Sequence, residues 1–204
     1  MPEEASVSPF LLIPLAFVAL VVWNNLEREH AYRRVHRLFA QGRPDEVLDY
    51  LDRWWVRLCF PTYNLTLLRL NAKLQKGDRK AAGTLMGDLL RSKCTKKQRA
   101  DLLPRAFDFY LQNGKYKQAQ VILDEITSTS TNPRFVAECQ LTYDITAKAD
   151  TSHIAEMEER AAHAEASERM RLLHLLAIQY ENARNPEMVE RCHERMSALV
   201  EKSL

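Results

Sequence analysis

Apolar residues recur at intervals of three and four along the chain from residue 26 onward, and short polar turns interrupt this pattern. The interruption is clearest within residues 110–126, where one helical pattern stops at Asn113 and Gly114 and another begins at once. Such intervals place apolar side chains on one face of an α-helix. The pattern therefore predicts an all-α chain built from pairs of helices with short connections.

These connections recur at a near-constant spacing, with intervals of 35, 37, 36 and 34 or 35 residues. The turn positions are Gly42, Gly77, Gly114, Asp150 and either Arg184 or Asn185. A period in this range is typical of helical repeat proteins, in which one hairpin buries too little apolar surface alone and stacks on its neighbours. An ordinary helical bundle is the alternative.

The individual units differ in how closely they follow the pattern. In the first unit a helix opens at Pro44, and its predicted apolar face consists of Val47, Leu48, Leu51, Trp54 and Trp55. In the third unit Pro104 predicts that the well-formed part of the first helix begins close to it. The fourth unit has no glycine in its turn at residues 149–151, so we expect it to be the least regular.

The third unit carries a recognisable signature. An aromatic residue, a turn glycine, a second aromatic residue, a small residue and two bulky apolar residues follow one another at Tyr110, Gly114, Tyr116, Ala119, Leu123 and Ile126. This spacing resembles the tetratricopeptide repeat (TPR) signature. The resemblance implies that residues 26–204 form a right-handed solenoid of about five helical hairpins. Phe107, where the TPR motif has Gly or Ala, and Val47, in place of an alanine, imply wider helix spacing than the family standard.

The resemblance also implies a binding site, because the first helix of each TPR hairpin lines a concave groove that accepts a peptide or a partner helix. The groove positions in this chain are Tyr32, His36, Phe39, Asn64, Asn71, Leu74, Asp108, Leu111 and Gln112. Tyr32, Phe39 and Leu111 are the strongest candidates, since apolar side chains gathered on an exposed concave face are typical of a binding surface. Ordinary helix packing or solvent exposure is the alternative for each residue.

The amino terminus contains a different kind of segment. Val7 to Trp23 is a run of 17 residues without charge, which is at the lower end of the length that spans a bilayer. The residues before it are acidic and no small-residue cleavage site follows, so we interpret it as an uncleaved anchor rather than a signal peptide. The predicted division is therefore a tail and single transmembrane helix at residues 1–25 and a repeat domain at residues 26–204.

Charge predicts the orientation of this anchor. No Lys or Arg precedes the apolar run, whereas Arg28, Arg33, Arg34 and Arg37 follow it, so we expect the N-terminus outside and the repeat domain in the cytoplasm. Residues 27–126 hold 20 Lys/Arg against 12 Asp/Glu, net +8, and residues 127–204 hold 9 against 13, net −4. This excess suits attraction to an anionic membrane leaflet. Nucleic acid is not an expected partner, because no exposed aromatic residues interleave the basic ones.

The sequence contains no recognisable catalytic motif. Phosphate-cradling glycine loops, zinc-binding histidine pairs and nucleophile elbows are absent, so we predict no catalytic, cofactor or metal site and no enzyme activity. Cys59, Cys94, Cys139 and Cys192 lie 35 to 53 residues apart, which predicts small core residues in a reducing compartment.

These observations favour a membrane-anchored TPR-like scaffold or adaptor that binds protein partners at the cytoplasmic face, and they leave homo-oligomers open. One alternative is a non-catalytic subunit or an enzyme with a dispersed site between helices. The other is the same solenoid outside the cytoplasm, in an assembly or transport role.

Overall fold

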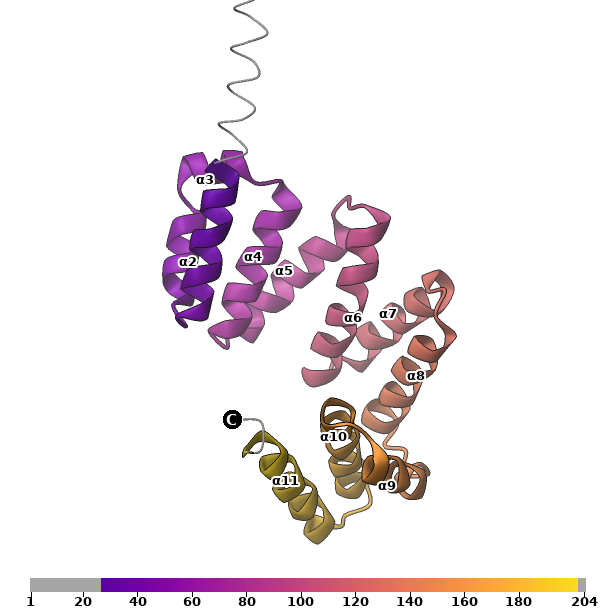
Figure 1. Ribbon diagram of the computed structural model, residues 1–204. Helices are drawn as coiled ribbons and strands as arrows, with labels where there is room; N and C mark the ends of the chain where they lie inside the picture. The colour runs from indigo at the N-terminus through magenta and orange to yellow at the C-terminus, as the bar shows by residue number, and fades with distance from the viewer. Residues whose placement is uncertain (1–26, 202–204) are drawn as a thin grey trace, which may run out of the picture. The chain divides into compact units, whose positions relative to one another are not determined.

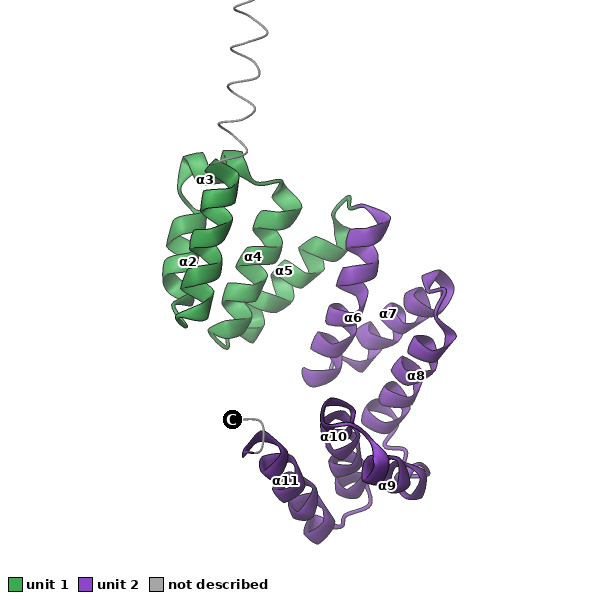
Figure 2. Ribbon diagram, viewed as in Figure 1, with its two compact units in different colours: residues 1–94 green, residues 95–204 purple. Residues whose placement is uncertain are grey.

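The structure, a computed structural model, describes residues 27–201 and consists of α-helices throughout that range (Figure 1). The prediction of an all-α chain is confirmed for these residues. The predicted anchor at Val7 to Trp23 lies outside the described residues. Between residues 27 and 201, no helix is both long enough and apolar enough to cross a membrane. The chain divides after Cys94 into two compact units (Figure 2).

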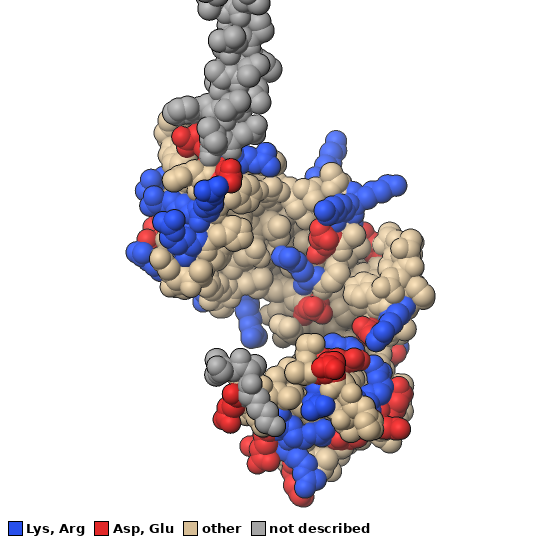
Figure 3. All heavy atoms as spheres, viewed as in Figure 1, with Lys and Arg blue, Asp and Glu red and all other residues tan. Residues whose placement is uncertain are grey.

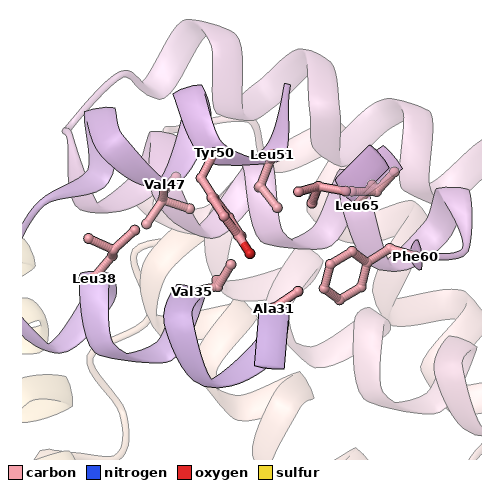
Figure 4. Packing of buried hydrophobic residues seen from close by; sticks show 10 residues of the cluster. Ala31, Val35, Leu38, Val47, Tyr50, Leu51, Phe60 and Leu65 are labelled. Atoms are coloured by element: carbon pink, nitrogen blue, oxygen red, sulfur yellow. The ribbon is translucent and has the colours of Figure 1, made fainter. Parts of the chain in front are cut away.

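Unit 1 begins with a helix whose described part covers residues 27–40. It continues with α2 (Pro44–Leu51), α3 (Trp54–Cys59), α4 (Thr62–Gln75) and α5 (Arg79–Arg91). Helix α4 packs against α2 and α5. The core of this unit joins Ala31 and Val35 of the first helix to Val47, Leu51 and Leu65, all of them buried (Figure 4).

One element of unit 1 differs from the prediction. The prediction of a continuous helix from Pro44 through Trp55 is wrong. The chain leaves the helical conformation at Arg53, whose φ of −63° and ψ of 132° are extended. The interruption makes α3 a separate helix. Trp55 therefore packs on Tyr50 with ring centroids 5.6 Å apart, while Trp54 is 75% exposed.

Unit 2 contains three further pairs of helices. Their bounds are α6 (Lys96–Gln112), α7 (Tyr116–Thr129), α8 (Pro133–Ala147), α9 (Ile154–His163), α10 (Ala166–Asn182) and α11 (Pro186–Glu201). Helix α10 packs against α8, α9 and α11, and its buried Leu172 and Leu176 form a core with Ile145, Met157 and Cys192. Helix α6 packs against α7 and α8.

Local sequence determines where the helices of unit 2 begin. Helix α6 starts eight residues before Pro104, so the prediction of a start near this proline is wrong. A capping box accounts for the earlier start. The Thr95 hydroxyl accepts a hydrogen bond from the Gln98 backbone N–H at 3.2 Å, and the Gln98 side chain accepts one from the Thr95 N–H at 2.9 Å. These two bonds satisfy backbone donors that a helix start leaves open.

The predicted turns all contain a residue in the left-handed region. These residues, with their φ angles, are Gly42 (66°), Gly77 (76°), Gly114 (66°), Ala149 (58°) and Arg184 (55°). The fourth one is Ala149 rather than the predicted Asp150, so the observed intervals are 35, 37, 35 and 35 residues. A left-handed residue directly after a helix reverses the chain and lets backbone N–H groups reach the last carbonyls.

Hydrogen bonds show that the turns are variations of one geometry. At Gly114, its N–H donates to the Leu111 carbonyl at 3.0 Å and the Lys115 N–H donates to the Tyr110 carbonyl at 2.9 Å. The same pair of bonds recurs at the turns of Gly42, Gly77 and Arg184. At Ala149 the corresponding bond reaches one residue further back, from the Asp150 N–H to the Asp144 carbonyl at 3.1 Å. The fourth turn is thus the irregular one, as the missing glycine predicts.

Candidate functional site

The first helices of the two hairpins in unit 1 lie side by side. The Asn64 side-chain N–H donates a 2.8 Å hydrogen bond to the Tyr32 hydroxyl, and the Gln75 side-chain N–H donates a 3.1 Å bond to the Phe39 carbonyl. Tyr32 and Asn64 lie near the starts of their helices, whereas Phe39 and Gln75 lie near the ends. Helix 27–40 and α4 therefore run parallel and are joined at both ends.

Six of the nine predicted groove residues lie on these two helices. His36 and Leu74 are exposed, the latter by 42%. Tyr32, Phe39, Asn64 and Asn71 are half-buried. We call three residues of this set, the exposed His36 and Leu74 and the half-buried Asn71, the unit 1 face.

The two aromatic candidates in unit 1 contribute mainly to packing. Tyr32 and Phe39 pack against the buried core, and the Tyr32 ring meets the Phe60 ring edge to face at 4.6 Å. Both side chains are half-buried rather than fully exposed. They lie four and three residues from His36 on the same helix, a spacing that places the three side chains on one helix face.

The remaining three predicted residues belong to unit 2. Asp108 and Gln112 are exposed on α6, whereas Leu111 is only 6% exposed. The expectation that Leu111 lies on an exposed face is therefore wrong. The reason is that α6 packs against both α7 and α8, so it buries more than one stripe of its surface, including Phe107 at 2% exposure.

Burial and nearby charges on α6 and α8 raise the pKa of one thiol, that of Cys139. The Asp108 side chain reaches solvent, but neighbouring atoms partly desolvate its carboxyl and raise its pKa. Burial raises the pKa of the Cys139 thiol to about 11, and the charges of Asp108 and Glu138 add to this shift. A thiol with so high a pKa is almost entirely protonated at neutral pH and is a poor nucleophile. Cys139 and Cys192 are buried, as predicted, whereas Cys59 and Cys94 are only half-buried.

An arginine-rich hollow in unit 1 is absent from the sequence predictions. It has a volume of about 500 Å³ and is lined by His30, Arg33, Arg34, Arg37, Leu38, Gln41, Arg43 and Glu46. Figure 3 shows Lys and Arg side chains gathered on this part of unit 1. The excess of basic residues is visible in the sequence. Their convergence depends on the turn at Gly42, which brings α2 back along the first helix.

Two of the four arginines that line this hollow form ion pairs with carboxylates, and two do not form one with any described residue. Arg33 pairs with Glu29 and Arg43 pairs with Glu46. The Arg34 guanidinium lies over the Tyr50 ring at 5.1 Å, on a residue of α2. For Arg34 and Arg37, no carboxylate among residues 27–201 forms an ion pair. The hollow therefore presents uncompensated positive charge.

A second hollow lies within unit 2, between α6, α7 and the start of α8. Its volume is about 490 Å³, and Leu103, Ile126 and Phe135 contribute apolar surface to it. At its edge Arg99 makes a two-pronged ion pair with Glu125, with both nitrogen to oxygen distances at 2.6 Å. This pair fixes α6 to α7 beside the hollow.

Within residues 27–201, no group of three or more His, Cys, Asp or Glu side chains is placed to hold a metal ion. Comparison of the chain with protein-family models, with curated proteins and with solved structures finds no match. The candidate site thus rests on its own geometry.

Proposed function

We propose that this chain is a membrane-anchored scaffold whose repeat domain holds protein partners at the cytoplasmic face of a membrane. In this proposal the hairpins form a right-handed, TPR-like solenoid of about five units. The recurrence of one turn geometry at intervals of 35 to 37 residues supports the repeat architecture. An apolar run of 17 uncharged residues, followed by four nearby arginines, supports the anchor and its orientation.

The observation that carries the binding proposal is the parallel pairing of helix 27–40 with α4. Two side-chain hydrogen bonds fix the pair at both ends, so the unit 1 face exists before any partner arrives. A preformed surface avoids much of the entropy cost of ordering side chains on binding. In this proposal the partner therefore docks onto a rigid face of the scaffold.

The chemistry of this face suits a partner helix or an extended peptide. Leu74 offers an apolar contact, because 42% of its surface is exposed. The Asn71 amide can both donate to and accept from a polar backbone group, and the exposed His36 imidazole can do the same when neutral. We propose that the partner places an apolar side chain on Leu74 and polar groups against Asn71 and His36.

The experiment compares proteins that copurify with the full chain from native membranes. The test variant combines His36→Ala, Asn71→Ala and Leu74→Ala. The control variant combines Lys80→Ala, Thr84→Ala and Val121→Ala, three exposed positions on α5 and α7. We expect at least one partner to be lost, by tenfold or more, from the test variant and retained by the control. Equal recovery of every partner by both variants, with unchanged circular dichroism, would refute the assignment.

A further inference from the structure

Helix α3 exposes two large apolar side chains on the same side. Trp54 is 75% exposed and Leu58 is 76% exposed, and they are four residues apart on this short helix. The neighbouring Arg53 and Arg57 are also exposed. Among residues 27–201, no carboxylate forms an ion pair with Arg53 or Arg57. We call these four side chains the α3 patch.

The α3 patch lies close to the start of helix 27–40. Phe60, directly after α3, packs its ring on Tyr32 at 4.6 Å. Burial raises the pKa of the Cys59 thiol at the end of α3, and the charge of Glu27, the first described residue, adds to that shift. Figure 1 shows α3 at the end of unit 1 where this first helix begins.

The predicted anchor ends only four residues before this point. Trp23 closes the apolar run and Glu27 is the first described residue. Four residues of fully extended chain span at most about 14 Å. An anchor that reaches the membrane surface at Trp23 therefore holds the α3 patch within a short distance of that surface.

Charge distinguishes unit 1 as well. Residues 27–94 contain 14 Lys/Arg and 8 Asp/Glu, a net charge of +6, whereas residues 95–201 contain 14 and 17, a net charge of −3. Part of the excess in unit 1 lines the arginine-rich hollow (Figure 3). Anionic lipid attracts clustered arginines, and Trp side chains favour the boundary between headgroups and acyl chains.

We propose that the α3 patch docks unit 1 on an anionic lipid surface. Trp54 and Leu58 enter the headgroup region, and Arg53 and Arg57, together with the arginine-rich hollow, contact headgroup phosphates. Two apolar side chains are too few to hold a soluble protein on a membrane, but the anchor keeps their effective concentration at the bilayer high. The inference rests on the anchor of the proposed function and adds a defined orientation of unit 1 on the membrane.

The test uses the full chain in vesicles whose acyl chains carry bromine, which quenches tryptophan fluorescence at short range. Trp23→Phe and Trp55→Phe leave Trp54 as the single tryptophan. The control adds Trp54→Phe and Val121→Trp, which moves the single tryptophan to an exposed position of unit 2. We expect quenching of Trp54 in vesicles with anionic lipid and much less in zwitterionic vesicles. Position 121 gives the quenching of an exposed tryptophan outside the α3 patch.

Charge variants measure how much the two arginines of the α3 patch contribute to docking on lipid. Arg53→Gln with Arg57→Gln is expected to weaken docking by about 30-fold, because each arginine near an anionic surface contributes roughly fivefold. The control replaces Lys115 and Lys117 of unit 2 by Gln, which removes the same charge. We expect the control to leave Trp54 quenching unchanged.

The outcomes separate the docking proposal from the anchor. Chain that floats with vesicles while Trp54 stays unquenched retains the anchor and overturns the docking. Chain that does not float overturns both. Equal quenching in zwitterionic and anionic vesicles overturns the assignment to an anionic surface. Protection of Trp54 from aqueous acrylamide without quenching by lipid bromine shows that protein covers the patch, which also overturns the proposal.

Discussion

The recurring turn geometry predicts opposite effects for two opposite substitutions. Gly114 has a φ of 66°, and a Cβ built on it meets nothing within 4 Å. Gly114→Ala therefore introduces left-handed backbone strain and no clash. The strain costs about 1–2 kcal/mol for an L-residue, and the reduced freedom of the unfolded chain returns about 0.4–1 kcal/mol. The expected net loss of unfolding free energy is about 1 kcal/mol.

Ala149→Gly is the reverse experiment. Ala149 already occupies the left-handed region, with a φ of 58°. Glycine relieves the strain there and loses the entropic advantage of alanine, so unit 2 should gain about 1 kcal/mol by the same two estimates. Both effects follow from the turn geometry alone.

Gly87→Ala supplies a matched control with the same chemical change. Gly87 lies inside α5, where its added Cβ would approach only the end of the exposed Arg91 side chain, at 3.3 Å. Alanine is favoured over glycine in a helix interior, so this variant should be stabilised by up to about 1 kcal/mol.

The assay is urea unfolding followed by circular dichroism, with amide hydrogen exchange to locate each effect. A change of about 1 kcal/mol corresponds to about a fivefold change in the exchange protection of the helices that flank the turn. Destabilisation by Ala149→Gly, or stabilisation by Gly114→Ala, would refute the assignment of these positions as equivalent left-handed turns.

For four further substitutions the structure predicts the direction of the change in stability or reactivity. Tyr32→Phe removes a 2.8 Å hydrogen bond to α4 and should lower the free energy of unfolding by about 1 kcal/mol. Tyr50→Phe removes a buried hydroxyl without a hydrogen-bond partner among residues 27–201, so it should leave the free energy of unfolding unchanged or raise it. Urea unfolding compares the two variants. The pKa of Asp78 lies below its usual value because a backbone N–H at the start of α5 donates to its carboxylate. Its stabilisation is present above about pH 4 and is lost as pH falls through the folded pKa, so Asp78→Asn should flatten acid unfolding in that range. Asp108→Asn should lower the Cys139 pKa from about 11 and accelerate alkylation of this thiol by iodoacetamide between about pH 8 and 10; an unchanged rate would contradict the electrostatic coupling.

The sequence was informative about the turns because a single physical requirement defines them. A left-handed residue favours glycine, and Gly42, Gly77 and Gly114 mark their turns directly. The fourth turn could not be placed to the residue, because Ala149 tolerates the same conformation at an energetic cost that no sequence pattern records. The all-α fold could be predicted for the same reason. Apolar residues at intervals of three and four have a single structural cause, the geometry of the α-helix.

Exposure was harder to predict, because it depends on neighbours that are distant in sequence. The interruption at Arg53 has no glycine or proline to signal it, and it turns Trp54 outward. Leu111 is buried because two helices pack on α6, which a pattern along α6 alone cannot show. Two of the residues predicted in unit 1, Tyr32 and Asn64, do meet, through a hydrogen bond between parallel helices.

The most direct test of the scaffold proposal places a photoreactive amino acid at position 74 of the full chain in native membranes. Position 121, which is also exposed and apolar in this chain, serves as the control. The scaffold proposal predicts a discrete protein crosslink from position 74 that is absent from position 121 and lost when Asn71 and His36 are replaced by Ala. The same crosslinks from both positions, or none from position 74, would contradict it.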